Sequence, residues 1–362
     1  MVMTHDERVI AAITDGKADM LPCFPAACGV NRRLVNGGIT YREWAHNAKL
    51  MAQSYVAGQK ALEMDSVCSM LDLSVMAADL GAHVRFDKEN TPFVDVPMVK
   101  SVEDYEKFTV PDIRKGRSGV LLEGTKLAFD ALKDNVGVAG FLEGPLLALS
   151  QTAGAERMFM DMYTNPSAIH RALGTITKYV AEMVKGMAKT GVAAMCWDYL
   201  WGNYSCLGDA EYKEFEGCKK YAGDLNALVN KEGMGYSVHN CADLPHLDIQ
   251  IKEYKPVIYT MAYYPLIPGS LSAGEVIEKG YADKCLVGGN IDPQLFIKAS
   301  VEQISQVTKD LCLEVKKALC KRGLGAKYAI AAGCEVPPDL NTKLENIKAV
   351  VDTTRIHGKI DW

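Results

Sequence analysis

The sequence predicts an α/β fold in which eight parallel strands and their helices close into a (β/α)8 TIM barrel, as a single domain over residues 1–362. Short apolar runs recur along the chain without polar alternation, which is typical of parallel strands covered on both faces. A longer stretch with helical periodicity follows each run, as in repeated strand–helix units. A chain of this length suits one barrel, and we find no linker or internal repeat that divides it.

The predicted elements follow one another in a regular order. A short amphipathic helix over 6–13 precedes the first strand, and a helical segment over 41–63 precedes the second. Residues 82–115, with three prolines and many charges, are predicted as an excursion after the second strand. A doubly wound open sheet is the alternative, but no G-x-G-x-x-G motif follows the first strand. The eight predicted strands cover 20–27, 66–71, 136–141, 192–197, 235–238, 257–261, 285–289 and 328–332.

Composition and charge narrow the kinds of partner. The net charge of −5 and the lack of a long Lys/Arg run argue against nucleic acid or a membrane surface. A small molecule or another protein remains. The 11 cysteines are odd in number and show no disulfide spacing, which predicts a reducing compartment. The polar N-terminus does not resemble a signal peptide, and no apolar run reaches about 18 residues. We therefore expect a cytoplasmic protein.

Three residues that can bind a metal follow predicted strands. His239 and Cys241 come after the fifth strand, and Cys334 comes after the eighth. Because the carboxyl ends of barrel strands meet at one mouth, we expect the three side chains to lie together. One imidazole and two thiolates are ligands that Zn²⁺ prefers, and three ligands leave a position open for catalysis. The alternative is two ordinary buried thiols and a hydrogen-bonded histidine.

Further polar and aromatic residues are predicted at the same mouth. Asp198 and Glu143 are candidate catalytic acids, although Glu143 could equally be a charge at a helix N-terminus. The aromatic side chains suit a slot for a flat apolar ligand, and their alternative role is to cover the barrel rim. The candidate substrate-binding residues are Trp197, Tyr199, Trp201, Tyr204, Tyr263, Tyr264 and Asn290.

Several motifs carry a resemblance to a known family. The segments 140–145, 289–293 and 333–338 resemble the uroporphyrinogen decarboxylase superfamily, and the resemblance extends over nearly the whole chain. Within it, His239-x-Cys241 with Cys334 is similar to the zinc pattern of corrinoid-dependent methyltransferases. The decarboxylases carry an arginine-rich motif near the N-terminus where this chain reads otherwise over 24–33, and a histidine-glycine motif in place of Gly333-Cys334. Porphyrinogen decarboxylation is therefore not expected.

The resemblance implies a zinc-dependent methyl transfer that involves a separate corrinoid protein, since this chain has no Asp-x-His-x-x-Gly cobalamin motif. In one direction, the methyl group of an aryl methyl ether passes to cobalt(I) of the corrinoid protein. In the other, methylcobalamin methylates a thiol such as coenzyme M. The aromatic segment and the lack of Arg or Lys at the strand ends favour the first. A barrel that binds a corrinoid or tetrapyrrole without catalysis is a third possibility.

Overall fold

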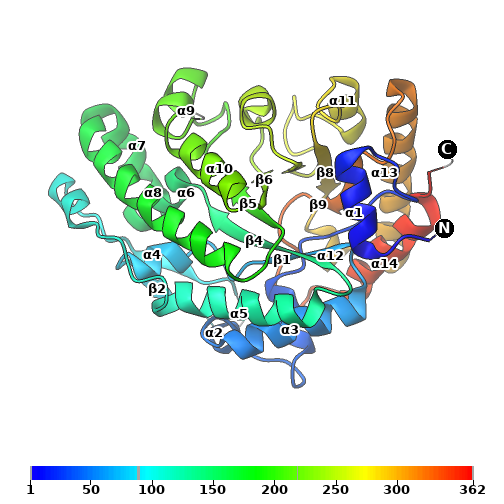
Figure 1. Ribbon diagram of the computed structural model, residues 1–362, viewed down its shortest axis with the longest axis horizontal. Helices are drawn as coiled ribbons and strands as arrows, with labels where there is room; N and C mark the ends of the chain where they lie inside the picture. Colours follow the sequence, from blue (N-terminus) through cyan, green and yellow to red (C-terminus); the bar gives the residue numbers. More distant parts are fainter. Residues whose placement is uncertain (1, 88–89, 218, 361–362) are drawn as a thin grey trace.

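The centre of the protein is a curled parallel sheet of seven strands in the order β1-β4-β5-β6-β7-β8-β9 (Figure 1). The computed structural model describes residues 2–87, 90–217 and 219–360. The parallel order along the chain confirms the predicted α/β barrel class. The strands are β1 (Ser66–Ser69), β4 (Gly137–Glu143), β5 (Ala194–Asp198), β6 (Gly235–Asn240), β7 (Ile258–Met261), β8 (Leu286–Ile291) and β9 (Tyr328–Ala332).

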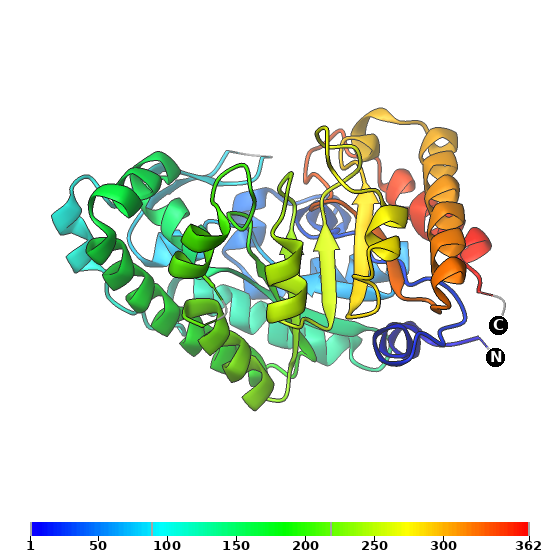
Figure 2. The ribbon, with the colours of Figure 1, turned by 90° about the horizontal axis from the view of Figure 1, so that it is seen from above.

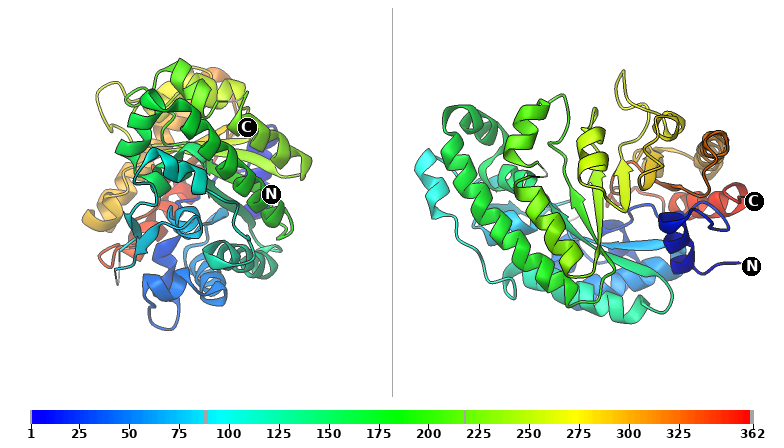
Figure 3. Two further views of the ribbon diagram at one scale, coloured as in Figure 1. Left: turned by 90° about the vertical axis from the view of Figure 1, so that its left-hand side faces the viewer. Right: turned by 45° about the horizontal axis from the view of Figure 1, so that its top comes forward.

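Helices cover the outside of this sheet. Figures 1 and 2 show α7 and α8 at one end of the molecule and α13 and α14 at the other. The right-hand view of Figure 3 shows α8 and α10 along the outer side of the strands. The helices are α1 (His5–Thr14), α2 (Tyr41–Ala45), α3 (Ala48–Leu62), α4 (Val75–Asp79), α5 (Gly116–Leu132), α6 (Pro145–Ala153), α7 (Ala155–Thr164), α8 (Pro166–Ala188), α9 (Asp209–Phe215), α10 (Tyr221–Lys231), α11 (Ala273–Glu278), α12 (Leu295–Lys298), α13 (Val301–Arg322) and α14 (Leu344–His357), with 3₁₀ turns η1 (Gly29–Leu34) and η2 (Val102–Lys107) and a π-helical turn η3 (Asp248–Glu253). Among the helices of the described residues, none is both long and apolar enough to cross a bilayer.

The first predicted strand, over 20–27, is a correction to the sequence analysis, because it forms only isolated bridges. The amide of Phe24 donates to the Ile330 carbonyl at 3.1 Å, and the amide of Ile330 donates to the Pro22 carbonyl at 2.8 Å. On the other side, the amide of Asp65 donates to the Cys23 carbonyl at 2.8 Å. The segment therefore lies between β9 and the start of β1. Pro22 and Pro25 lack amide donors, which prevents a regular ladder here.

The predicted excursion after the second barrel strand is confirmed. It contains β2 (His83–Arg85) and β3 (Phe93–Val96), which pair as a separate antiparallel ribbon, followed by η2. Pro92 and Phe93 of this excursion also line the cavity described below. The excursion therefore contributes to the mouth of the barrel.

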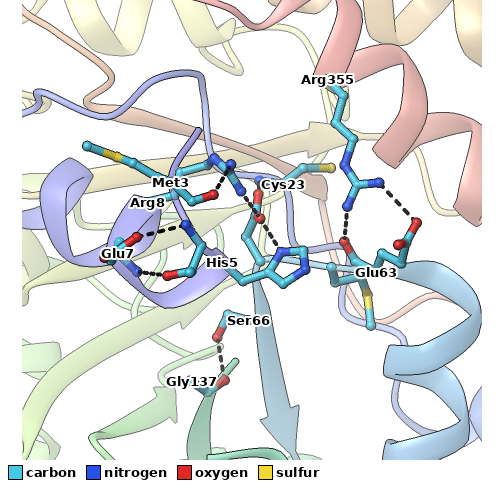
Figure 4. A network of polar contacts seen from close by, with 12 residues as sticks. Met3, His5, Glu7, Arg8, Cys23, Glu63, Ser66, Gly137 and Arg355 are labelled. Atoms are coloured by element: carbon cyan, nitrogen blue, oxygen red, sulfur yellow. Dashed lines mark hydrogen bonds and ion pairs between the residues drawn. The ribbon is translucent and has the colours of Figure 1, made fainter. Parts of the chain in front are cut away.

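Helix α1 closes the opposite end of the barrel through a buried ion-pair network (Figure 4). The Arg8 guanidinium donates to Asp65 at 2.6 Å and to Asp19 at 2.8 Å, and His5 lies 2.8 Å from Asp65. Arg8 and Asp65 are both buried. A capping box starts the helix, in which the Thr4 hydroxyl accepts from the Glu7 amide. These contacts fix α1 against the N-terminal ends of the strands.

Candidate metal centre

Four side chains form one row across the C-terminal ends of neighbouring strands. Glu143 of β4 is in register with Asp198 of β5, which is in register with His239 of β6. His239 is in turn in register with Thr260 of β7. Side chains at the same level of parallel strands point to the same side of the sheet, here into the barrel. We call these four residues the metal row.

His239 meets Cys241 and Cys334 at this row, as the sequence predicts. The ligand atoms of the three side chains all lie within 4.8 Å of one another. The Thr260 hydroxyl lies 2.8 Å from Nδ1 of His239, which leaves Nε2 for a metal. One imidazole nitrogen and two thiols at this spacing fit a three-ligand Zn²⁺ site with a free fourth position.

Two local features bring the ligands to the same point. Asn240, between the ligands of β6, is fully buried, and its amide group donates to the carbonyls of Tyr199 at 2.9 Å and Gly202 at 3.0 Å. Gly333 passes so close to the Tyr263 backbone that a Cβ would lie 2.1 Å from that nitrogen. A side chain at position 333 would therefore push Cys334 away from the β6 ligands.

The two thiols differ in acidity. The hydrogen bond between Cys241 and Cys334 lowers the pKa of Cys334, and His239 lowers it further. The same hydrogen bond raises the pKa of Cys241. The lowered pKa favours the thiolate of Cys334, and a thiolate is the form of cysteine that binds metals.

Of the two predicted acids, Asp198 lies beside the ligand His239, and Glu143 lies one strand further along the row. Burial raises the pKa of Asp198 to about 7, and one of its carboxylate oxygens has no hydrogen-bond partner. Burial also raises the pKa of Glu143 well above its ordinary value, and the charges of Asp72 and Asp198 add to this effect. Two neighbouring buried carboxyls resist carrying two negative charges, so the pair retains a proton near neutral pH.

A large cavity extends from the metal row into the barrel. Its volume is about 620 Å³. Asp198, His239 and Cys334 line its upper part, and apolar and small residues such as Phe24 and Ala139 line most of the rest. Cavities of this size and polarity are typical sites for small organic ligands. We call it the barrel cavity.

A family model described as uroporphyrinogen decarboxylase (URO-D) matches residues 4–357 of the chain. The chain belongs to the uroporphyrinogen decarboxylase family. The resemblance predicted from its motifs is therefore confirmed.

Relatives of the chain in this family include methyltransferases and decarboxylases. The methylcobamide:CoM methyltransferase of Methanosarcina acetivorans is 24% identical over 244 residues, which covers 66% of this chain and 70% of that protein. A uroporphyrinogen decarboxylase of Anaeromyxobacter dehalogenans is 22% identical over 371 residues, covering 98% of this chain and 99% of that protein. The fold is similar to the structure of a methyltransferase from Methanosarcina mazei, with a TM-score of 0.80 at 19% identity over 98% of this chain and 99% of that one.

In this member of the uroporphyrinogen decarboxylase family, two predicted substrate contacts are core residues instead. Trp197 and Tyr199 are fully buried, and the Tyr199 hydroxyl lies 2.6 Å from that of Tyr236. Asp198 separates them and faces the barrel cavity. Since side chains alternate along a strand, its two neighbours point outward into the layer between sheet and helices. The expected aromatic slot is therefore not built from these rings.

The other predicted substrate contacts lie around the rim. The Trp201 indole donates to the Ser150 hydroxyl at 2.8 Å, and Tyr264 is exposed at the surface. Tyr204 and Tyr263 line a separate hollow of about 270 Å³. The buried Asn290 side chain donates to the Ala262 carbonyl at 2.7 Å. Among the described residues that line the barrel cavity, none belongs to the predicted aromatic set.

Several contacts of the site were not predicted. Thr260 orients His239, and Gln250 of the π-helical turn accepts a hydrogen bond from Asn240 at 3.1 Å. Asp72 lines the barrel cavity and pairs with Arg117 of α5 through two hydrogen bonds. In the sequence, the polar Thr260 inside an apolar run is the one signal that could have been noticed. The contacts of Gln250 and Arg117 depend on tertiary packing.

Proposed function

We propose that this chain is a zinc-dependent methyltransferase that moves a methyl group from an aryl methyl ether to cobalt(I) of a separate corrinoid protein. The observation that carries the proposal is the meeting of His239, Cys241 and Cys334 at the top of a mainly apolar cavity. The methyltransferases among the family relatives support the same class of reaction.

Each side chain of the metal row, and each of the two cysteines beside it, has a part in the proposed reaction. His239, Cys241 and Cys334 would hold Zn²⁺, which supplies Lewis acidity toward the oxygen of the donor. Thr260 fixes the ring of His239 by its hydrogen bond at 2.8 Å. Asp198 lines the barrel cavity and would supply the proton that the donor oxygen takes up as the methyl group departs. Glu143, its neighbour in the row, would share that proton with Asp198. The apolar walls below exclude water from this step.

The lining of the barrel cavity supports a neutral donor. Among the described residues that line it, none is a lysine or arginine. A small sulfonated thiol would need a cationic partner, whereas an aryl ether needs an apolar one. Arg117 lies nearby, but Asp72 already neutralises it.

Methylation of a thiol from methylcobalamin is the second candidate. Two relatives favour it, namely the methylcobamide:CoM methyltransferase of Methanosarcina acetivorans and a methylated-thiol–coenzyme M methyltransferase of Methanosarcina mazei, which is 24% identical over 220 residues. In this direction, the same three ligands would hold Zn²⁺, which keeps the acceptor as a thiolate.

A reconstituted assay tests the proposal. The zinc-loaded protein is mixed with reduced corrinoid protein and with methoxybenzenes, and the visible spectrum reports methylation of cobalt(I). We expect conversion with aryl ethers, about one zinc per chain, and loss of both in Cys334→Ser. The exposed Cys320 offers a matched control, and Cys320→Ser should keep both.

Three other outcomes of this assay would contradict the proposal. Demethylation of methylcobalamin by coenzyme M, without turnover of any ether, would show that the chain methylates a thiol instead. Binding of the corrinoid protein without methyl transfer in either direction would support a barrel that binds without catalysis. Full activity in metal-free protein would exclude the zinc mechanism.

A further inference from the structure

We propose that the bore of the barrel beneath the metal row binds an elongated, mainly apolar body of the methyl donor, with one hydrogen-bonding oxygen at the level of Ser237. This inference rests on the proposed function and names the class of substrate. The donor would stand along the barrel axis, with its methyl end at the metal row and its far end toward α1.

The strand register divides the bore into layers. Directly below the metal row, Phe141, Cys196, Ser237 and Ile258 share one level. Below that layer, Ala139, Ala194 and Gly235 share the next. Each layer lies two residues further along a strand, so Ala194 is about 13 Å below Asp198.

The bore is hollow at these deeper layers. The inward-facing Cys68, Ala194 and Ile258 are only half-buried, whereas their outward-facing neighbours Val67, Met195 and Tyr259 are buried. Bulky branched side chains fill the interior of an ordinary TIM barrel. Here the third layer consists of Cys68, two alanines and a glycine, which are too small to meet at the axis. The volume of about 620 Å³ therefore includes this depth.

Ser237 indicates where a polar atom of the ligand belongs. Its side chain lines the barrel cavity and is only 4% exposed. Its hydroxyl is buried and has no hydrogen-bond partner. An unpaired buried hydroxyl is costly, and an oxygen of a ligand at this level would satisfy it. The distance from the metal row to Ser237 is one layer, similar to the length of a benzene ring.

The floor of the bore is mainly apolar, with Asp6 of α1 as its one carboxylate among the described lining residues of that helix. Val9 and Ile13 of α1 line the cavity from below, where the helix closes the barrel. A ligand that extends past Ser237 therefore meets mainly apolar contacts on its way to α1, where Asp6 also lines the cavity. A donor with a short body would leave this space filled only by water.

Binding of three ethers to the zinc-loaded full-length chain tests the inference, with no corrinoid protein present. The ethers are methoxybenzene, 4-methoxyphenol and 4-butylmethoxybenzene, and calorimetry gives each Kd. We expect 4-butylmethoxybenzene to bind about ten- to a hundredfold more tightly than methoxybenzene, because four more carbons leave water. Ala194→Leu should remove this advantage, since the new side chain fills the third layer.

Two controls separate the bore from unrelated effects. Ala210→Leu adds the same side chain at an exposed position of α9 and should leave all three affinities unchanged. Ser237→Ala should raise the Kd of 4-methoxyphenol about tenfold relative to that of methoxybenzene, and it should leave the Kd of 4-butylmethoxybenzene unchanged. Equal affinity of the wild-type protein for the short and long ethers would overturn the inference. So would undiminished preference for the butyl ether in Ala194→Leu.

Failure of the inference and failure of the proposed function are distinguishable. If affinity depends on the length of the ether but no methyl group reaches cobalt, ligand binding in the bore is supported and the proposed methyl transfer is contradicted. If methoxybenzene donates its methyl group but affinity does not depend on the length of the ether, the proposed reaction is supported and binding in the bore is contradicted.

Discussion

Thr260 shows how one hydroxyl can decide the quality of a metal site. It lies 2.8 Å from Nδ1 of His239 and so fixes the direction of the other ring nitrogen. Loss of a hydrogen-bond partner of this kind typically lowers the metal affinity by about ten- to a hundredfold. We expect Thr260→Val to raise the Kd for Zn²⁺ by that factor in competition with a fluorescent chelator. Thr260→Ser keeps the hydroxyl and should keep the affinity, and an unchanged Kd in the valine variant would contradict the role.

The buried Glu216 should make the stability of the protein depend on pH. It accepts a hydrogen bond from the Leu146 amide at 3.0 Å, and burial raises its pKa to about 8 from an ordinary value of 4.5. Between these values the folded chain keeps a proton that the unfolded chain releases. The free energy of unfolding therefore falls as pH rises through this window, by up to about 1.4 kcal/mol per pH unit.

Glu216→Gln removes this titration. Relative to the wild-type protein, we expect its melting temperature to be similar at pH 4 and higher at pH 8. Parallel melting profiles of the two proteins across this range would show that Glu216 does not titrate as described.

At the scale of elements, the buried cation of Arg8 helps to hold α1 against the barrel. Arg8 contacts both Asp65 and Asp19, and its loss would leave the buried Asp65 without its guanidinium partner, with only His5 beside it as an ionisable base. We expect Arg8→Met to lower the free energy of unfolding by about 3–5 kcal/mol in urea denaturation. Lys17 pairs with Asp15 at the surface, with 3.8 Å between the charged atoms. Lys17→Met should therefore change the free energy of unfolding by less than about 0.5 kcal/mol. Similar losses in both variants would argue against the buried network.

The elements also show what the sequence can predict. Seven of the eight apolar runs are strands, because parallel strands buried by helices need continuous apolar residues. The eighth, over 20–27, is interrupted by Pro22 and Pro25, which an apolar count does not weigh. The metal ligands were predictable because strand ends converge at the mouth of a barrel. The outward direction of Trp197 and Tyr199 was also predictable, since Asp198 between them must face the other way. The partners of Asn240 were not, because they come from distant loops.

At the scale of the whole molecule, zinc should be linked to folding. A ligand set assembled from β6 and the end of β9 exists only in the folded chain, so bound Zn²⁺ stabilises that state by mass action, about 2.7 kcal/mol at a hundred times its Kd. We expect chelation to lower the melting temperature and added zinc to restore it. Cys334→Ser should melt at the same temperature with or without chelator. A wild-type protein that is equally indifferent to chelation would speak against the site.

The position of Cys334, far beyond His239 and Cys241 in the sequence, also bears on biosynthesis. A ribosome must translate 93 further residues after Cys241 before the last sulfur ligand exists. Nascent fragments and prematurely terminated products therefore lack the complete set of three, and they cannot acquire the proposed catalytic ion in this arrangement. The order of the ligands along the sequence thus delays a complete set until the chain has been translated past Cys334.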